Sequence, residues 1–330
     1  MIPFHNLNDF PDWLRGGAVA IGNFDGVHLG HARLVERLRV MAKLVGGPAV
    51  VFTFDPSPTR VLRPDAAPEP LLWLGRKVEI LAELGADAVF AYPTDKHFLG
   101  MEARDFFDGI IRAQFDARAM VEGPNFFFGR NRSGNVEVLR RFCAEAGVKF
   151  EVAEPVEVGG QIVSSSRVRS LVMAGRLDEV GAMLGRPYRI RGVVVRGAGR
   201  GAKIGYPTAN VGQIDTLLPG KGIYAARARV GSRHTPCAET ADGTRSVPAT
   251  KAPTTDIWQP AAVSLGPNPT FDEGGIKVEA YIIGFQGDIY GQPIEVDFLA
   301  RLRDIERFGS VDALLAQMGR DVARTIEICH

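Results

Sequence analysis

The sequence predicts a doubly wound α/β module followed by a small antiparallel β-barrel with a closing C-terminal helix. Three observations lead to this prediction. Short apolar runs alternate with amphipathic helical patterns through the first half, Gly185 and Pro187 then interrupt the chain, and short strands rich in β-branched and aromatic residues follow. A chain of 330 residues is long enough for two domains that each bury a core.

The first half contains strand-like apolar runs at residues 18–24, 49–54, 86–92, 118–123 and 149–154. Helical patterns lie between them, most clearly at residues 31–44 and 135–147. Short apolar strands separated by amphipathic helices are typical of a parallel sheet that is covered on both faces. We therefore expect a doubly wound sheet in this half.

The domain boundary is expected at the end of a helical stretch, residues 166–184. Gly185 follows as a helix stop, and Pro187 cannot continue the helix. The predicted domains are therefore residues 1–185 and residues 186–330.

The second half contains strand-like runs at residues 188–197, 222–230, 261–266, 277–285 and 293–299, separated by Gly and Pro turns. This pattern is typical of a small antiparallel barrel. Residues 310–326 have apolar side chains at helical spacing, and Ser310 is placed to cap that helix. The stretch from Thr235 to Pro260 has no periodicity and is expected to be a long exposed loop.

Composition excludes several classes of protein. With 45% hydrophobic and 23% charged residues the chain has the balance of a globular protein, and a net charge of +1 gives no reason to expect a nucleic-acid partner. No apolar run is long enough to cross a membrane, and the N-terminus lacks a signal-peptide pattern. The widely spaced Cys143, Cys237 and Cys329 are expected to be free thiols. We therefore expect a cytoplasmic protein with no membrane partner; composition does not indicate its oligomeric state.

The run GNFDGVHLGH at residues 22–31 follows the first strand and leads into a helix. His28 and His31 are three residues apart, so both project from the first helical turn toward one place. A helix N-terminus binds anions, the imidazoles add donors, and Gly30 permits close approach of a nucleotide. Such a site can stabilise charge that develops at an α-phosphorus. On the alternative interpretation, the two histidines are surface residues that cap a helix.

This run resembles the HxGH signature of the nucleotidyltransferase superfamily, in the form found in prokaryotic bifunctional riboflavin kinase/FAD synthetases. The resemblance continues at residues 122–129, at Arg132 and Gly134, and at residues 164–169. It implies that His28 and His31 are catalytic. It also implies nucleotide or substrate contacts for a larger set: Gly22, Asn23, Phe24, Asp25, Gly26, Gly30, Asn125, Ser164, Ser165, Arg167 and Arg169.

One residue departs from the family pattern. The family commonly has FxPHP after its second strand, whereas this chain has Ser57 where the histidine is expected. The departure concerns the adenylylation of FMN to FAD. It leaves open a chain that acts as a kinase only.

A second glycine-rich and basic run occupies residues 196–210 and could wrap a polyphosphate with backbone N–H groups. Residues 197–202 formally match a dinucleotide fingerprint, but Pro207 would interrupt the helix that this fingerprint must open. The sequence also lacks GxxxxGK[ST], which excludes a P-loop.

The end of this run, residues 207–210, resembles the PTAN motif of riboflavin kinases, which are small antiparallel barrels. Thr208 and Asn210 alternate to one face of an extended chain and offer hard oxygen ligands for Mg²⁺. The resemblance makes Glu279 the base that activates the riboflavin hydroxyl for attack on the γ-phosphate of ATP. It further implies substrate or nucleotide contacts for Gly199, Gly201, Lys203, Gly205, Pro207 and Arg303. Taken without the resemblance, Arg301 and Arg303 are surface ion-pair residues.

The predicted function is therefore bifunctional flavin cofactor biosynthesis, with ATP as co-substrate and Mg²⁺ as cofactor. Riboflavin would be phosphorylated to FMN, and FMN would be adenylylated to FAD with release of pyrophosphate. Two alternatives stay open: a kinase-only enzyme, and a flavin-binding regulatory barrel attached to a nucleotidyltransferase of other specificity.

Overall fold

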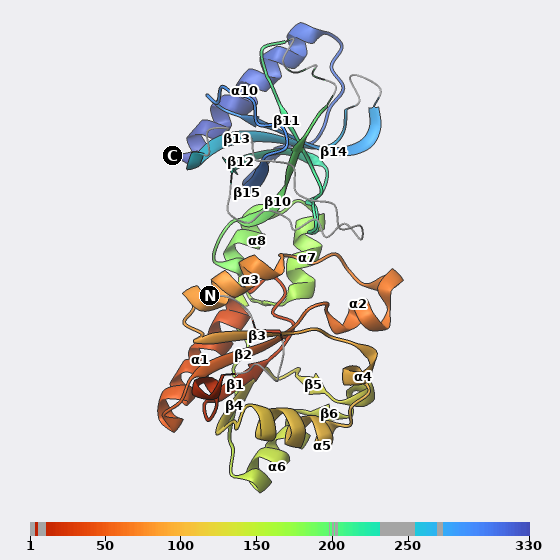
Figure 1. Cartoon of the computed structure of the whole chain (residues 1–330). Coiled ribbons are helices and arrows are strands. Elements are labelled where there is room, and N and C mark those ends of the chain that lie inside the picture. The colour runs from red at the N-terminus through yellow and green to blue at the C-terminus, as the bar shows by residue number, and fades with distance from the viewer. Residues whose placement is uncertain are drawn as a thin grey trace. The chain divides into compact units, whose positions relative to one another are not determined.

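The computed structural model describes residues 4–5, 11–197, 199, 201, 204–231, 255–268 and 273–330. The chain divides into two compact units, Met1–Ser165 and Ser166–His330 (Figure 1).

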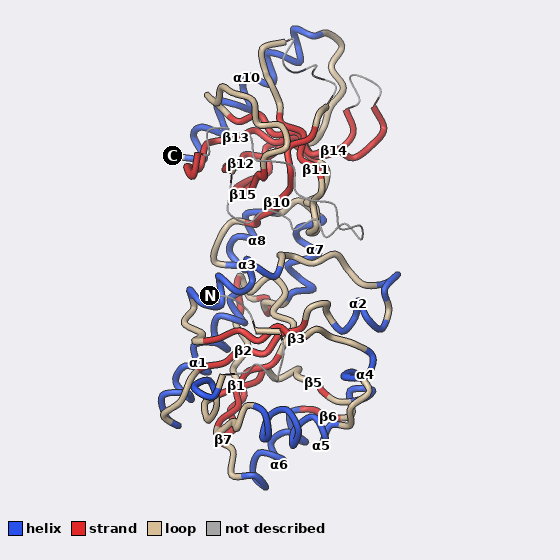
Figure 2. The backbone as a smooth tube through the Cα atoms, viewed as in Figure 1, coloured by secondary structure: helices blue, strands red, loops and turns tan. Residues whose placement is uncertain are grey.

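The first unit is built around a parallel five-stranded sheet, as the alternation of strands and helices predicted. Its strands are β1(Ala18–Ile21), β2(Ala49–Phe54), β3(Ala88–Tyr92), β4(Ala119–Glu122) and β7(Lys149–Val152), in the spatial order β3-β2-β1-β4-β7. Figure 2 shows these strands with helical segments around them. The strand order reverses between β1 and β4, which is where ligands bind in doubly wound folds.

Both faces of the sheet are buried at its central strands. Val19 and Ile21 of β1 point into an aromatic-rich cluster with Phe52 and Phe90, while Ala18 and Ala20 on the opposite face are buried as well. This accounts for apolar runs without polar alternation. The helices of this unit are α1(Leu29–Val45), α2(Pro58–Leu62), α3(Leu74–Glu83), α4(Lys96–Leu99), α5(Ala103–Phe106) and α6(Val136–Ala146), with the π-helix η4(Phe107–Gln114) and the 3₁₀ turns η2(Asp12–Leu14), η3(Pro64–Ala66) and η5(Arg130–Arg132). Short hairpins are formed by β5(Phe127–Phe128) with β6(Gly134–Asn135), and by β8(Glu157–Val158) with β9(Gln161–Ile162).

The second unit contains a closed six-stranded antiparallel barrel. Its strands are β10(Tyr188–Val195), β11(Ala209–Gly212), β12(Gly222–Val230), β13(Thr255–Asn268), β14(Glu273–Ile282) and β15(Pro293–Arg303), and the order around the barrel is β10-β11-β14-β13-β12-β15. Alternate residues such as Ile190, Val194, Val296 and Phe298 are buried, as expected for the interior of a small barrel.

Helices in the described residues of the second unit accompany the barrel. They are α7(Ser165–Met173), α8(Leu177–Leu184) and α10(Val311–Cys329). α8 packs against β10 and β15, and α10 packs against β12, β13 and β15. Gly185 ends α8 in the left-handed conformation, and the Ser310 hydroxyl accepts a hydrogen bond from Ala313 N at 3.2 Å, so the predicted stop and the predicted cap are both confirmed.

The expected loop between Thr235 and Pro260 was partly wrong. Residues 255–260 belong to β13, which pairs with β12 from Val230↔Thr255 to Gly222↔Leu265. Tertiary pairing overrides the weak local signal of a Thr- and Pro-rich stretch. The remainder of that stretch lies outside the described residues, as does Cys237; Cys143 and Cys329 are free thiols.

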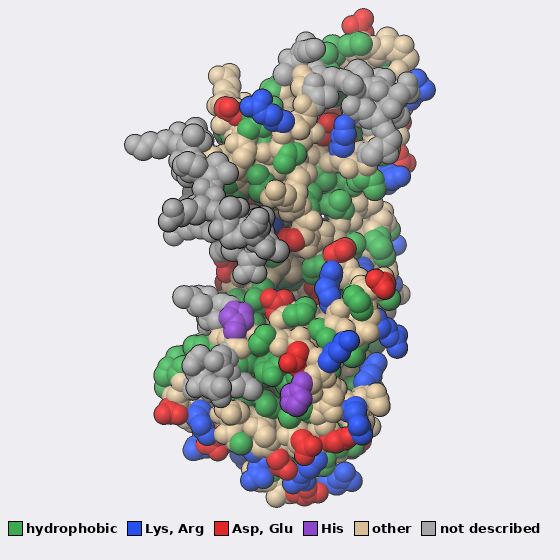
Figure 3. Space-filling model, turned by 45° about the vertical axis from the view of Figure 1, so that its right-hand side comes forward, with side chains coloured by type: hydrophobic (Ala, Val, Ile, Leu, Met, Phe, Trp, Pro, Cys, Tyr) green, Lys and Arg blue, Asp and Glu red, His purple; other side chains and the backbone are tan. Residues whose placement is uncertain are grey.

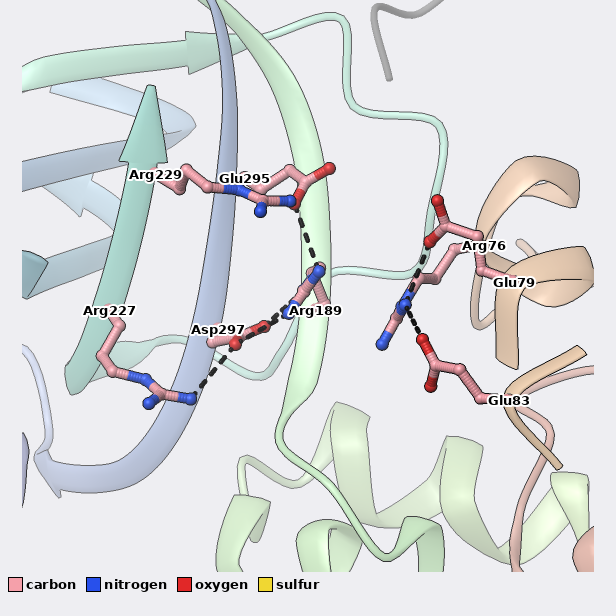
Figure 4. A network of polar contacts seen from close by, with 8 residues as sticks. All are labelled: Arg76, Glu79, Glu83, Arg189, Arg227, Arg229, Glu295 and Asp297. Carbon is pink, nitrogen blue, oxygen red and sulfur yellow. Dashed lines mark hydrogen bonds and ion pairs between the residues drawn. The ribbon is translucent and has the colours of Figure 1, made fainter. Parts of the chain in front are cut away.

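An ion-pair cluster covers part of the outer face of the barrel (Figure 4). Glu295 and Asp297 of β15 are only 0% and 2% exposed, although they point away from the barrel interior. Arg189 of β10 binds both carboxylates, and Arg227 and Arg229 of β12 each bind one. Because buried carboxylates need paired donors, this cluster fixes β10 and β12 on either side of β15.

Apart from this cluster, positively and negatively charged side chains are mixed on the surface that Figure 3 draws. On the face drawn in Figure 3, basic and acidic side chains are interspersed among the coloured residues. This agrees with the near-zero net charge of the chain.

Candidate active sites

The loop between β1 and α1 has a backbone that ordinary residues rarely adopt. Phe24, Gly26 and Val27 have positive φ angles of 46°, 80° and 36°. Such conformations persist only when the surroundings hold them, and they are common at ligand-binding sites. The contacts that hold this loop therefore matter for function.

Side chains and backbone from distant elements fix the loop at Asn23 and Asp25. The Asn23 carbonyl accepts hydrogen bonds from Lys77 Nζ at 2.7 Å and from Thr53 Oγ1 at 3.2 Å. The Asp25 carboxylate accepts one from Leu71 N at 2.9 Å, and the Asp25 carbonyl accepts one from Ser165 Oγ at 2.8 Å. The predicted site residues Asn23, Asp25 and Ser165 are thus brought together.

Lys77 is a buried lysine beneath this loop, with 8% of its surface exposed. Burial lowers the pKa of its ammonium group, and the nearby carboxylates of Asp25 and Asp55 act in the opposite direction. The charged form is stabilised by the Asn23 carbonyl. Lys77 therefore joins α3 to the loop.

His28 and His31 lie together at the N-terminus of α1, as their spacing predicted. His28 is the N-cap residue, and its Nδ1 accepts a hydrogen bond from His31 N at 3.4 Å. The two rings are stacked, with centroids 3.8 Å apart and an interplanar angle of 15°. Because Nδ1 of His28 accepts, the neutral ring carries its hydrogen on Nε2, where it can donate to a ligand.

Gly30 and Phe24 lie next to the two histidine rings. A Cβ on Gly30 would stand 3.1 Å from the His28 ring and 3.7 Å from Val163 O, so the position requires a small residue. The Phe24 ring is buried and lies 5.0 Å from the His31 ring. Together they set the position of the imidazole pair.

Other predicted residues of the first motif set lie on separate elements. Asn125 is exposed and lies between β4 and β5. Ser164 is half-buried just before α7, while Arg167 and Arg169 lie on α7 in the second unit. Ser57 caps α2, because its Oγ accepts a hydrogen bond from Arg60 N at 3.4 Å.

In the barrel, Asn210 and Glu279 face each other directly. They are paired residues of the antiparallel strands β11 and β14, and Ser264 of β13 is paired with Glu279 on its other side. Ala209, Val211, Val278 and Ala280 are buried. The three polar side chains therefore share the outer face.

Thr208 lies next to this row. A Cβ on Gly201 would stand 3.3 Å from Thr208 Oγ1 and 2.3 Å from Tyr206 O, and a Cβ on Gly197 would stand 2.1 Å from Asn210 Nδ2. Gly201 and Gly197 thus lie directly against Thr208 and Asn210, respectively. Gly199 and Gly205 have φ angles of +67° and +86°, and Lys203 lies outside the described residues.

Arg303 is held by a buried acidic residue. Its Nε and one terminal nitrogen bind the Asp321 carboxylate of α10 at 3.1 and 2.7 Å. This bidentate pair anchors α10 to β15. Arg303 thus forms an ion pair, as its residue type alone suggested. A contact between Arg303 and a ligand stays a prediction.

Two family models match the chain, FAD synthetase over residues 11–167 and riboflavin kinase over residues 184–329. A bifunctional riboflavin kinase/FMN adenylyltransferase from Pseudomonas fluorescens is 32% identical over 97% of this chain and 94% of its own length. The chain belongs to the bifunctional riboflavin kinase/FMN adenylyltransferase family. It is therefore an enzyme with an adenylyltransferase unit and a kinase unit, both of which take a group from ATP.

Other relatives also match this chain over nearly its whole length. The bifunctional riboflavin kinase/FMN adenylyltransferase of Escherichia coli strain K12 is 31% identical over 96% of this chain and 93% of its own length. A crystal structure reported as a macrolide-efflux protein from Streptococcus pneumoniae is 30% identical, with a TM-score of 0.80 and coverage of 98% of each chain. Across the described part of this chain, no helix has the length and apolarity that a membrane crossing needs.

Two buried residues of the adenylyltransferase unit, Lys77 and Glu122, were given no role from the sequence, although Glu122 begins the run of residues 122–129 that carries the resemblance. Each left a signal. Lys77 is a charged residue on the helix face that also carries Leu81, and Glu122 ends an otherwise apolar strand. A charge at a core position is rare without a specific partner.

Among the described residues, no group of three or more His, Cys, Asp or Glu side chains could hold a metal ion. A magnesium site that uses a hydroxyl, an amide oxygen and nucleotide phosphates does not need such a group. The Thr208 and Asn210 oxygens have this chemistry.

Proposed function

We propose that the adenylyltransferase unit transfers AMP from ATP to FMN at the stacked pair of His28 and His31. The FMN phosphate would attack the α-phosphorus of ATP, and pyrophosphate would leave. The pair supports this proposal because it places two imidazole rings, with centroids 3.8 Å apart, at the positive end of a 17-residue helix. Charge on the α-phosphoryl oxygens would be stabilised there.

The surrounding loop would shape the ATP site. Gly22, Gly26 and Gly30 would let the backbone approach the phosphates, with Asn23, Phe24 and Asp25 holding the loop in place. Asn125 would contact the flavin substrate, and Ser164, Ser165, Arg167 and Arg169 would bind phosphate oxygens. The Arg side chains suit this role because they present a fixed fork of donors.

In the kinase unit, Glu279 would accept the proton of the riboflavin 5′-hydroxyl as the oxygen attacks the γ-phosphorus of ATP. Its pairing with Asn210 supports this role, because it places the base beside the proposed metal ligand. Thr208 and Asn210 would hold Mg²⁺, which would neutralise phosphate charge when bound. Gly199, Gly201, Lys203, Gly205 and Pro207 would wrap the phosphates, and Arg303 would contact the substrate.

Riboflavin, FMN and ATP are thus the proposed ligands, with no nucleic acid and no membrane as partner. We place the enzyme in the cytoplasm, which the free thiols of Cys143 and Cys329 support. We also propose that residues 1–185 and 186–330 are the two functional domains, since Gly185 ends α8 directly before β10.

The test is chromatographic product analysis of three full-length proteins with riboflavin, ATP and Mg²⁺. The parent should form FMN first and then FAD. The double variant His28→Ala/His31→Ala should form FMN at the parental rate but FAD at least about 10²-fold more slowly. Glu279→Gln should slow FMN formation by about 10²–10⁴-fold and still convert added FMN to FAD.

Each variant is the folding control for the other activity. Parental FAD formation by the double histidine variant would reject the His28 and His31 assignment. It would favour an enzyme that phosphorylates riboflavin only, which the Ser57 departure left open. Parental FMN formation by Glu279→Gln would reject the proposed base.

A further inference from the structure

The pairing between β1 and β4 stops before β1 ends. β1 pairs with β2 along its whole length, through Ile21↔Phe52, but with β4 only at Ala18↔Ala119 and Val19↔Met120. Ala20 and Ile21, the last half of β1, therefore have no β4 residue in that register. This place is where the strand order of the sheet reverses.

Glu122 bridges that gap with its side chain. Its backbone belongs to the other side of β4, where it pairs with Val152 and accepts a hydrogen bond from Ala153 N at 2.8 Å. Its Oε1 accepts a hydrogen bond from Ile21 N, also at 2.8 Å. A carboxyl group thus takes the place of a backbone carbonyl at the end of β1.

The position gives this hydrogen bond a functional consequence. Ile21 directly precedes Gly22, the first residue of the loop that carries the imidazole pair. Gly22 N is bonded on the opposite side to Phe52 O at 3.0 Å. The origin of the loop is therefore fixed from β2 by backbone and from β4 by Glu122.

The surroundings of Glu122 disfavour a negative charge on its carboxyl group. The residue is 0% exposed, and its second oxygen, Oε2, has no hydrogen-bond partner among the described residues. Burial raises the pKa of Glu122 well above its usual value, against the effect of the Ile21 N–H. Cys143 of α6 interacts with it electrostatically, and the pKa of that thiol is itself raised to about 12, chiefly by burial.

We propose that Glu122 is a positioning residue of the adenylyltransferase site, which fixes the end of β1 and thereby the placement of His28 and His31. This inference rests on the proposed function of the first unit. It adds a buried side chain from another strand, which would act through the loop rather than by contact with substrate. Because a displacement of about 1 Å at reacting groups can cost about 10²-fold in rate, loss of this hydrogen bond should lower kcat for FAD formation.

The experiment compares Glu122→Gln, Glu122→Asp and Glu122→Leu in the full-length protein, with both activities measured on each sample. Glu122→Gln keeps an acceptor oxygen at the same reach, and FAD formation should stay within about threefold of the parent. Glu122→Leu removes the acceptor and should lower kcat for FAD at least about tenfold, with KM for ATP little changed. Glu122→Asp withdraws the acceptor by one methylene and should lower kcat to a similar extent.

Met120→Leu is the matched control, because it alters a buried side chain on the same strand at nearly constant volume. It should leave FAD formation at the parental rate, and FMN formation should be unchanged in all four variants. A parental kcat for FAD in Glu122→Asp would overturn the proposal even if Glu122→Leu fails to fold. An equal loss in Glu122→Gln and Glu122→Leu would overturn it as well.

The two proposals fail separately. If the double histidine variant retains FAD formation, the site is misassigned whatever Glu122 does. If that variant is inactive and the Glu122 variants are all parental, only the positioning role is rejected.

Discussion

The ammonium group of Lys77 lies 2.7 Å from the carbonyl oxygen of Asn23, across 54 residues of sequence. This contact joins α3 to the strained turn that precedes the imidazole pair. The same nitrogen lies 3.4 Å from Thr53 Oγ1, so Lys77 connects the loop, β2 and α3.

Lys77→Met should therefore impair adenylyl transfer specifically. Methionine fills similar space but leaves the Asn23 carbonyl with the weaker Thr53 bond, so the turn loses its main restraint. We expect FAD formation from FMN to fall by about 10-fold to 100-fold, while FMN formation from riboflavin is unchanged. Initial rates of both reactions on one preparation are the measurement. The exposed Lys96 provides the control, since Lys96→Met should alter neither rate.

Gly30→Ala separates stability from activity. A glycine within a helix costs about 0.5–1 kcal/mol relative to alanine, so the melting temperature should not fall. The added Cβ, however, would stand 3.1 Å from the His28 ring, which must shift by a few tenths of an ångström. FAD formation should drop several-fold. Gly109→Ala, with no heavy atom within 4 Å of its Cβ position, should leave FAD formation unchanged, and equal rates for the two variants would refute the steric argument.

Gly197→Ala should act on the kinase unit in the same way. Its Cβ would stand 2.1 Å from Asn210 Nδ2, so the amide must turn away from its present position. If Asn210 is a magnesium ligand, the Mg²⁺ concentration for half-maximal FMN formation should rise at least about threefold. Titration with Mg²⁺ tests this directly. Gly309→Ala has open space around its Cβ and serves as the control in the same unit.

The pair of Arg303 and Asp321 should contribute mainly to stability. Removing one partner of a buried ion pair costs about 3–5 kcal/mol, so Asp321→Asn and Arg303→Met should each lower the unfolding free energy strongly. The double variant should lose much less than the sum, which denaturant titration will show. The exposed pair of Arg324 and Glu327 should give almost no coupling. A rise in KM for riboflavin or ATP in Asp321→Asn without loss of stability would instead indicate that Arg303 binds substrate.

The buried carboxyl of Glu122 predicts a pH dependence of stability. Its folded pKa lies above the unfolded value of about 4.3, so unfolding releases a proton between those two values. The free energy of unfolding of the parent should therefore fall as pH rises through that window, by up to about 1.4 kcal/mol per pH unit. Glu122→Gln cannot ionise. The stability of this variant relative to the parent should increase from pH 5 to pH 8, and a constant difference would show that Glu122 is already ionised in the folded state.

The sequence predicted those features that depend on local spacing. His28 and His31 are near neighbours along one helix, and residues 208–210 follow the alternation of an extended chain, so both could be placed from the sequence. Lys77 and Glu122 could not, because their partners lie 54 and 101 residues away and only the packed sheet brings them together. The start of β13 was missed for a related reason. Residues 255–260 are held in a strand by β12 rather than by their own β-propensity.

Each half of the chain closes its own interior, a parallel sheet in one and a sealed cylinder of strands in the other. Damage to the chemistry of one half therefore leaves the architecture of the other intact. An allele that lacks only the kinase activity and an allele that lacks only the adenylyltransferase activity should then complement each other in one cell. The FMN that is released by the chain with an active barrel can diffuse to the chain with an intact histidine pair.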